Sequence, residues 1–127
     1  AKWYEEILGL TVESDSDRTP EFSKAVTGVA GAKLRVVQMS GHGLHFELMQ
    51  YVEGSGSKIA SSPNNIGSAQ VGFKTSDGPG LYADWKAKGV KMWSPCPAEV
   101  PNGPMKGGFI FFCEDPDGSV LKFMQTP

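Results

Sequence analysis

The sequence has few cysteines, no long apolar run and no cluster of basic residues. Its two cysteines among 127 residues, Cys96 and Cys113, form neither a disulfide framework nor a CxxC pair. Twelve basic and 14 acidic side chains give a net charge of −2, without the basic stripe that nucleic acid requires. Apolar runs such as Gly108–Cys113 are too short to span a bilayer. We therefore expect neither nucleic acid nor a membrane as a partner.

The first residues also lack the features of a secretory signal. Ala1–Glu6 includes two acids, where a signal peptide has a basic start followed by an apolar stretch. Together with the sparse cysteines, this pattern favours a reducing, cytoplasmic location, although one disulfide between Cys96 and Cys113 stays open. The length of 127 residues and the 39% hydrophobic content are typical of one globular domain.

Glycine and proline, at 16 and 9 residues, divide the chain into short elements. In the first half, the apolar spacing before Gly9 predicts the end of a short helix, with Glu5–Leu10 closing it. The polar stretch Glu13–Pro20 predicts a loop. Lys33–Met39 and Leu44–Val52 are predicted as strands joined by a hairpin turn at residues 40–43.

The second half follows the same order. Ala69–Thr75 is predicted as a strand, and Asp77 offers N-cap chemistry for a helix that ends at Gly89. The remaining segments are predicted as three strands and one Pro/Gly-rich loop, namely Val90–Trp93, Gly108–Cys113, Ser119–Gln125 and the loop Ser94–Gly107. That loop is the best candidate for a lid, because loops of this length are often functional.

The two halves form a weak internal repeat. Leu34–Gln50 aligns without a gap on Phe109–Gln125, so that Gly43 coincides with Gly118 and both segments end in Met-Gln. Such a repeat indicates a duplicated supersecondary unit. We expect one domain over residues 1–127, with a first module over 1–53, a linker over 54–65 and a second module over 66–127.

The two predicted modules differ at their starts. The second begins with the strand Ala69–Thr75, whereas the first begins directly at its helix. The first module is therefore expected to lack its opening strand, which would leave an open sheet edge where that strand belongs.

Strand alternation assigns the side chains to two faces. Leu44, Phe46 and Leu48 are expected under a helix, and the opposite face carries the polar or flexible side chains His45, Glu47 and Met49. In the second half, the face equivalent to that of Glu47 is expected to carry Val120, Lys122 and Met124, together with Gln70. Ala69, Val71 and Phe73 are expected to be buried. Glu47, Gln70 and Lys122 should thus line one concave surface.

At these residues the sequence resembles the vicinal oxygen chelate superfamily of glyoxalases, bleomycin resistance proteins and extradiol dioxygenases. The resemblance lies in the helix end Trp3–Leu10, the segment Phe46–Met49 and the turn Glu114–Ser119, and it covers nearly the whole chain. It implies an α+β fold of paired βαβββ modules that form an incomplete barrel, usually as a homodimer, with a ligand cleft inside.

The resemblance also implies a divalent metal held by one side chain from the first and one from the last strand of each module. Carried onto this chain, the first ligand is absent with its strand, Glu47 is retained, Gln70 stands where His is usual, and Lys122 stands where Glu is usual. A charged ammonium has no lone pair for a metal. We therefore expect no metal cofactor. If one binds (Zn, Ni, Fe or Mn), its ligands would be Glu47 and Gln70, with His45 as a possible third.

Two functions remain open from the sequence. The first is a divergent member of this superfamily that binds a small organic molecule without a standard metal centre. Its ligand-binding residues would be those of the concave face and nearby apolar side chains: His45, Glu47, Gln70, Lys122, Trp93, Phe111, Met49 and Met124. The alternative is a metal-dependent lyase or isomerase resembling lactoylglutathione lyase, or a dioxygenase, with Glu47 as the catalytic ligand or base.

Two further hypotheses concern the pair of Glu47 with Lys122 and the roles of the two cysteines. Glu47 and Lys122 are equivalent in the repeat, so they could face each other and form a Lys–Glu pair in place of the metal charge; each could equally be a solvated surface residue. Cys113, at the end of an apolar strand, is expected to be a small core residue. Cys96 lies between two prolines with no basic neighbour in the sequence, so a nucleophilic role is not expected.

Overall fold

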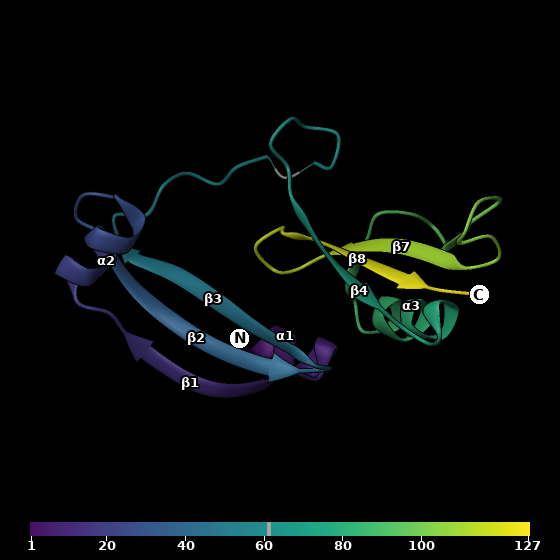
Figure 1. The fold of residues 1–127 in the computed structure, drawn as a ribbon, viewed down its shortest axis with the longest axis horizontal. Coiled ribbons are helices and arrows are strands. Elements are labelled where there is room, and N and C mark those ends of the chain that lie inside the picture. The colour runs from purple at the N-terminus through teal and green to yellow at the C-terminus, as the bar shows by residue number, and fades with distance from the viewer. Residues whose placement is uncertain (61) are drawn as a thin grey trace. The chain divides into compact units, whose positions relative to one another are not determined.

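The computed structural model describes residues 1–60 and 62–127. It contains two compact units, residues 1–58 and 59–127, and each unit has its own sheet (Figure 1). The boundary between them lies inside the stretch 54–65 that the sequence suggests as a linker; one domain with modules over 1–53 and 66–127 stays a prediction. No helix within the described residues is long and apolar enough to cross a membrane.

The first unit is a three-stranded antiparallel sheet with two short helices. Its strands lie in the order β1-β2-β3 (Figure 1). The elements in chain order are α1 (Lys2–Leu8), β1 (Thr11–Asp17), α2 (Pro20–Thr27), β2 (Lys33–Gly41) and β3 (Leu44–Glu53). The fold class predicted from the sequence, α+β with no opening strand in the first module, is confirmed.

Helix α1 is held at both its end and its buried face. Gly9 adopts the left-handed conformation at φ 66°, and its N–H is bonded to the carbonyl of Glu5, which confirms the predicted helix stop. The buried Tyr4 ring lies 5.2 Å from the ring of Phe46 on β3. A ring nitrogen of His42, in the β2–β3 turn, lies 2.8 Å from the carbonyl oxygen of Leu8. The turn therefore anchors the helix end.

Strand β1 corrects the prediction of a loop over Glu13–Pro20. Six of its residues pair with β2, and a bulge at Glu13 interrupts the register. The strand is polar because it lies at the edge of the sheet and is largely exposed, so it has no apolar alternation to indicate a strand. Helix α2, which follows at once, begins with Thr19 as its N-cap and Pro20 in its first turn.

The second unit is a mostly antiparallel sheet covered on one face by a helix. Its main path is β4-β8-β7-β5, and β6 pairs with β7; Figure 1 shows β4, β8 and β7 side by side. The elements in chain order are β4 (Gln70–Lys74), α3 (Gly78–Ala87), β5 (Lys91–Met92), β6 (Ala98–Glu99), β7 (Phe109–Glu114) and β8 (Val120–Gln125). Asp77 caps α3 by accepting from the N–H of Gly80, as predicted.

An aromatic cluster forms the core of the second unit. Phe111 on β7 stacks on Phe123 of β8 at 5.2 Å, and Trp85 of α3 meets the Phe123 ring edge-on at 4.7 Å. Phe73 is buried with them. The expectation of a buried Val71 is wrong, since this side chain is 42% exposed, and Ala69 is exposed too. Ala69 immediately precedes β4 and Val71 is its second residue, and β4 is an edge strand of the sheet.

The two hairpins are equivalent, but their turns differ by one residue. In the first, Gly41 pairs with Leu44 across a two-residue turn. In the second, Glu114 pairs with Val120, and the N–H of Asp115 bonds to the carbonyl of Ser119, which leaves a three-residue turn. The gapless alignment of the repeat is therefore wrong by one residue before the turn. Met39 corresponds to Cys113, while Glu47 still corresponds to Lys122.

The strands β3 and β8 differ in their neighbours within the described part of the chain. Strand β8 lies between β7 and the parallel strand β4, whereas β3 has β2 as its only neighbour among the described residues. The edge of β3 is thus open at the place that β4 fills in the second unit, as the sequence predicts.

Candidate ligand-binding faces

In each unit, one face of the sheet lies away from the helix-covered core. In the first unit this open face carries Glu47, which is exposed and accepts a hydrogen bond from the side-chain amide of its cross-strand neighbour Gln38. His45 lies two residues away, and its Nδ1 is 3.9 Å from a carboxylate oxygen of Glu13. Met49 is 54% exposed on the same face.

The open face of the second unit has Lys122 in a row that crosses the sheet. The register places Gly72 on one side of Lys122 and Phe112 on the other. Trp93, whose N–H bonds to the carbonyl of Phe112, continues the row and is 38% exposed. The Lys122 Nζ lies 5.9 Å from the centre of the Phe112 ring, at the limit of a cation–π contact.

The neighbouring rows supply one polar and one apolar side chain. Gln70 is exposed and pairs in register with the buried Val120, one row from Lys122. Met124 is half-buried and lies opposite Ile110 and beside Lys74. Gln70, Lys122 and Met124 therefore share the open face, as the alternation predicts.

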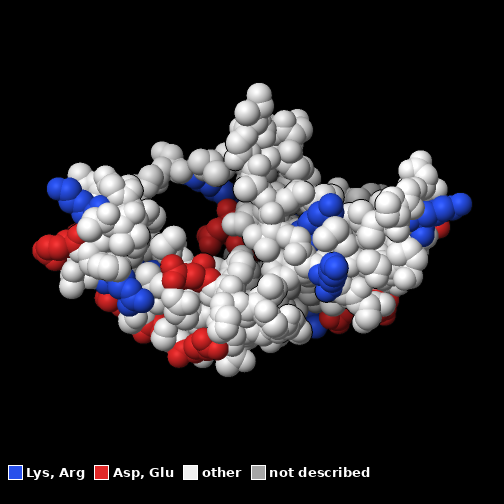
Figure 2. Space-filling view, viewed as in Figure 1, with Lys and Arg blue, Asp and Glu red and all other residues white. Residues whose placement is uncertain are grey.

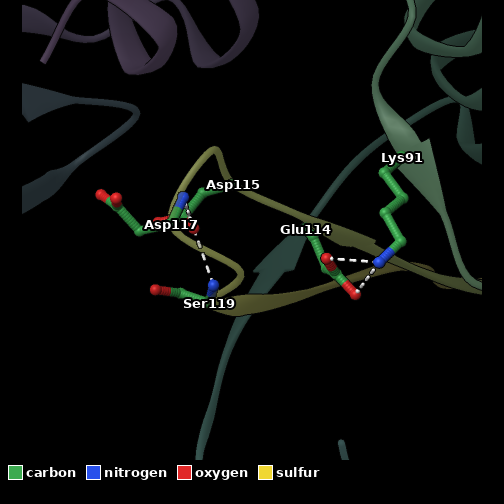
Figure 3. Close-up of polar contacts among 5 residues, drawn as sticks. All are labelled: Lys91, Glu114, Asp115, Asp117 and Ser119. Carbon is green, nitrogen blue, oxygen red and sulfur yellow. Dashed lines mark hydrogen bonds and ion pairs between the residues drawn. The ribbon is translucent and has the colours of Figure 1, made fainter. Parts of the chain in front are cut away.

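The negative charge of Glu114, at the end of this face, is compensated by the ammonium of Lys91. Both of its carboxylate oxygens accept hydrogen bonds of 2.9 Å from the ammonium of Lys91 (Figure 3). The Glu114 side chain is 14% exposed and that of Lys91 is 73% exposed. Glu114 carries the carboxylate of the open face that is closest in register to Lys122, and Lys91 engages it.

The turn that follows has a structural role. Asp115 is buried, and its Oδ1 accepts from the backbone N–H groups of Asp117 at 3.0 Å and Ser119 at 2.7 Å; Figure 3 shows the carboxylate beside Ser119. These bonds hold the turn closed, in agreement with the turn chemistry of aspartate. The sequence motif thus shapes the hairpin that presents Lys122.

The structure corrects the prediction that Phe111 contributes to ligand binding. Phe111 is 2% exposed and lies among Tyr82, Trp85 and Phe123 on the helix-covered face, so it cannot contact a ligand on the open face. Its neighbour Phe112 takes that place. Strand alternation places Phe112 on the open face once Phe112 is paired with Lys122. The gapless repeat would pair Lys122 with a different residue.

Much of the predicted lid, Ser94–Gly107, is bonded to the second unit. The Tyr82 hydroxyl donates to the carbonyl of Ser94 at 2.6 Å, and the backbone groups of Val100 bond to Gly107 and Gly108. Strand β6 pairs with β7 in between. A role of this loop as a lid stays a prediction.

Neither cysteine is in a disulfide. Cys113 is fully buried in the core, as predicted, and burial raises its pKa to about 12, with the charges of Asp115 and Glu114 adding to the shift. Cys96 is exposed. Cys113 is therefore a protonated, unreactive thiol at neutral pH.

The donor groups do not fit a standard divalent metal centre. Within residues 1–60 and 62–127, no three His, Cys, Asp or Glu side chains gather as a metal-binding group. Glu47 is hydrogen-bonded to Gln38, and Lys122 offers an ammonium rather than a lone pair. The pairing of Glu47 with Lys122, which lie in different units, stays a prediction.

Charge is mixed over the surface. On the face drawn in Figure 2, the basic side chains of the described residues are scattered and form no continuous patch.

Comparison with known proteins points to one family. The model of the Glyoxalase/Bleomycin resistance protein/Dioxygenase superfamily matches residues 1–123. A search of curated proteins finds no match.

Solved structures share the fold at low sequence identity. A glyoxalase family protein from Bacillus cereus has a TM-score of 0.72 at 17% identity, over 94% of this chain and 80% of its own. A glyoxylase/bleomycin resistance protein/dioxygenase domain from Frankia sp. EAN1pec has a TM-score of 0.65 at 19% identity, over 99% and 85%. The trypanothione-dependent glyoxalase I of Leishmania major has a TM-score of 0.57 at 21% identity, over 98% and 75%.

Proposed function

Because the chain belongs to the Glyoxalase/Bleomycin resistance protein/Dioxygenase superfamily, we propose that it binds a small organic molecule on the open faces of its sheets without a standard metal centre. The observation that carries the proposal is the position of Lys122. This lysine stands where the resemblance expects a carboxylate ligand, and it lies in a row with Gly72 and Phe112 on the open face. A cation beside an aromatic ring is a group for ligand recognition rather than for chelation.

The other residues of the proposed site supply a few polar groups and an apolar surface. Glu47 and Gln70 are the further polar groups. The side chains that would contact the apolar part of the ligand, or border it, are His45, Met49, Trp93 and Met124. This mixture of few polar groups with apolar surface is common in small-molecule sites. A homodimer and a cytoplasmic location belong to the same proposal.

The alternative is a metal-dependent lyase or isomerase, or a dioxygenase, in which Glu47 is a ligand or a base. It is supported by the fold likeness to glyoxalase I of Leishmania major and by the exposed carboxylate of Glu47. The ammonium of Lys122 disfavours it, because a positive charge at the ion would add repulsion to a donor set that already lacks ligands.

The proposal is tested by analysing what copurifies with the protein. Native mass spectrometry of the purified chain is expected to show an organic adduct, which extraction releases and which the Lys122→Met variant retains poorly. The matched control is Lys24→Met, which removes an exposed lysine of α2 in the first unit and is expected to keep the adduct. An adduct that is unchanged in Lys122→Met would contradict the assignment of this face as the binding site.

A further inference from the structure

The ammonium of Lys122 lacks a carboxylate partner within the described part of its own unit. The ion pairs of the second unit join Lys88 to Asp84 and Lys91 to Glu114. Glu114, the acid on the same face, has both oxygens engaged by Lys91. Lys122 is only half-exposed, and its Nζ has the Phe112 ring as its neighbour. A partly buried cation in such surroundings favours an incoming anion.

The face also has a gap next to this lysine. Gly72 on β4 is exposed and pairs in register with Lys122. A Cβ added at Gly72 would meet a single side-chain atom, the Cε of Met124 at 3.4 Å. The strand neighbours on the same face, Gln70 and Lys74, both carry long side chains. The missing side chain at Gly72 therefore leaves room for part of a ligand against the backbone of β4.

Flat apolar surface borders the same lysine on its other side. Phe112 is half-buried, and Trp93 is 38% exposed after it in the row. Aromatic rings bind flat, unsaturated groups in stacked or edge-on arrangements. The row from Gly72 to Trp93 thus combines an open slot, a cation and two aromatic rings.

From this row we infer the class of ligand: an organic anion with a flat, apolar body, whose negative group pairs with Lys122 and whose body lies over Gly72 and along Phe112. The inference rests on the proposed function, since it names the chemistry of the molecule that the open face binds. Gly72 becomes a specificity-determining residue, because any side chain there competes with the ligand for the same space.

The test uses two probes with the same aromatic body and polar groups of similar size, the anion 2-naphthoate and the neutral 2-naphthamide. Isothermal titration of the full chain is expected to show tighter binding of 2-naphthoate than of 2-naphthamide. A charge-assisted hydrogen bond corresponds to a difference of about tenfold or more in the dissociation constant. Lys122→Met is expected to remove that difference, and Lys122→Arg is expected to restore most of it.

Two further variants separate the slot from the charge. Gly72→Leu is expected to weaken binding of both probes, and Gly72→Ala to weaken it less, with circular dichroism confirming that each variant is folded. Lys24→Met, which removes an exposed lysine of α2 in the first unit, is the matched control and should leave the preference for 2-naphthoate unchanged. A preference that persists in Lys122→Met, or equal binding of the two probes, would overturn the inference while leaving the proposed function standing. If neither probe binds, the inference fails; if in addition no molecule copurifies, the proposed function fails with it.

Discussion

The equivalent hairpins of the two units carry side chains of opposite charge at equivalent positions. Glu47 on β3 and Lys122 on β8 occupy equivalent positions on the open faces, but Glu47 is bonded to a polar neighbour, Gln38, whereas Lys122 lies over an aromatic ring. The second sheet also has a strand, β4, at the edge that is open in the first. The comparison teaches that the duplicated framework is kept while the chemistry of its two faces has diverged.

The first way to sharpen the comparison is to remove an aromatic side chain from each face of the second sheet. Phe111→Ala should lower the free energy of unfolding by about 3–5 kcal/mol, because it opens a cavity among Tyr82, Trp85 and Phe123. Phe112→Ala should cost clearly less, since that ring is half-exposed. Urea unfolding of both variants measures the difference, and equal losses would contradict the assignment of the two faces.

A smaller effect is expected at the turns, where the hairpins differ. Asp115→Ala removes the acceptor of two backbone N–H groups and should cost about 1–3 kcal/mol. Asp115→Asn keeps one acceptor and should cost less. In the first hairpin, Gly43 has φ 76°, so Gly43→Ala should cost about 1 kcal/mol through backbone strain. Chemical denaturation compares the three variants; a neutral Asp115→Ala would show that the turn closes without the carboxylate.

The third difference between the units is a titratable group in the core of the second. Cys113 corresponds to Met39 of the first unit, and both are fully buried. The pKa of the folded thiol is raised to about 12 from 9.0, so the unfolded chain loses this proton first as the pH rises. Stability is therefore fully present below pH 9 and falls between pH 9 and 12, by at most about 1.4 kcal/mol per pH unit.

Denaturation across that range tests the thiol directly. Cys113→Ala should be less stable at pH 7, because it leaves a cavity, but its free energy of unfolding should fall less steeply above pH 9. A thiol reagent at pH 8 should modify Cys96 rapidly and Cys113 only after unfolding. Equal labelling rates in the native protein would contradict the burial of Cys113.

The smallest effect is expected on the surface of the first unit. Arg35 and Asp15 form a bidentate ion pair between β2 and β1, and the hydrogen bond from Arg35 lowers the pKa of the Asp15 carboxyl. The pair is exposed, so Asp15→Asn should change stability only slightly. Its contribution is present above the ordinary pKa of aspartate and is lost as the pH falls below it. Thermal unfolding at low and high salt should show the effect fading as salt screens the pair.

Sequence patterns predict the elements of this fold where local signals and tertiary structure agree. Gly9 ends α1 and Asp77 begins α3 as expected, because caps depend on a few adjacent residues. Strand β1 was not predicted, since a polar edge strand is fixed by its pairing with β2. Helix α2 was missed despite its Thr19-Pro20 start, a local signal that could have indicated it.

The candidate site is predictable to the extent that strand register is. Alternation within β3 and β8 correctly places Glu47 and Lys122 on the open faces. The sequence patterns assign no face to the residues of β7, and the pairing in the structure places Phe112 opposite Lys122 and Phe111 opposite the buried Phe123. The arrangement of the two units relative to each other, and with it the pairing of Glu47 and Lys122, depends on contacts that a single sequence does not encode locally.

The central claim is that the chain binds an organic molecule without a standard metal centre, and elemental analysis of the purified protein tests it most directly. Protein prepared without chelators, and its Glu47→Ala variant, should both contain far less than one Zn, Ni, Fe or Mn per chain, while the organic adduct is present. One equivalent of any of these metals in the native chain, lost in Glu47→Ala, would contradict the account and favour the metal-dependent enzyme.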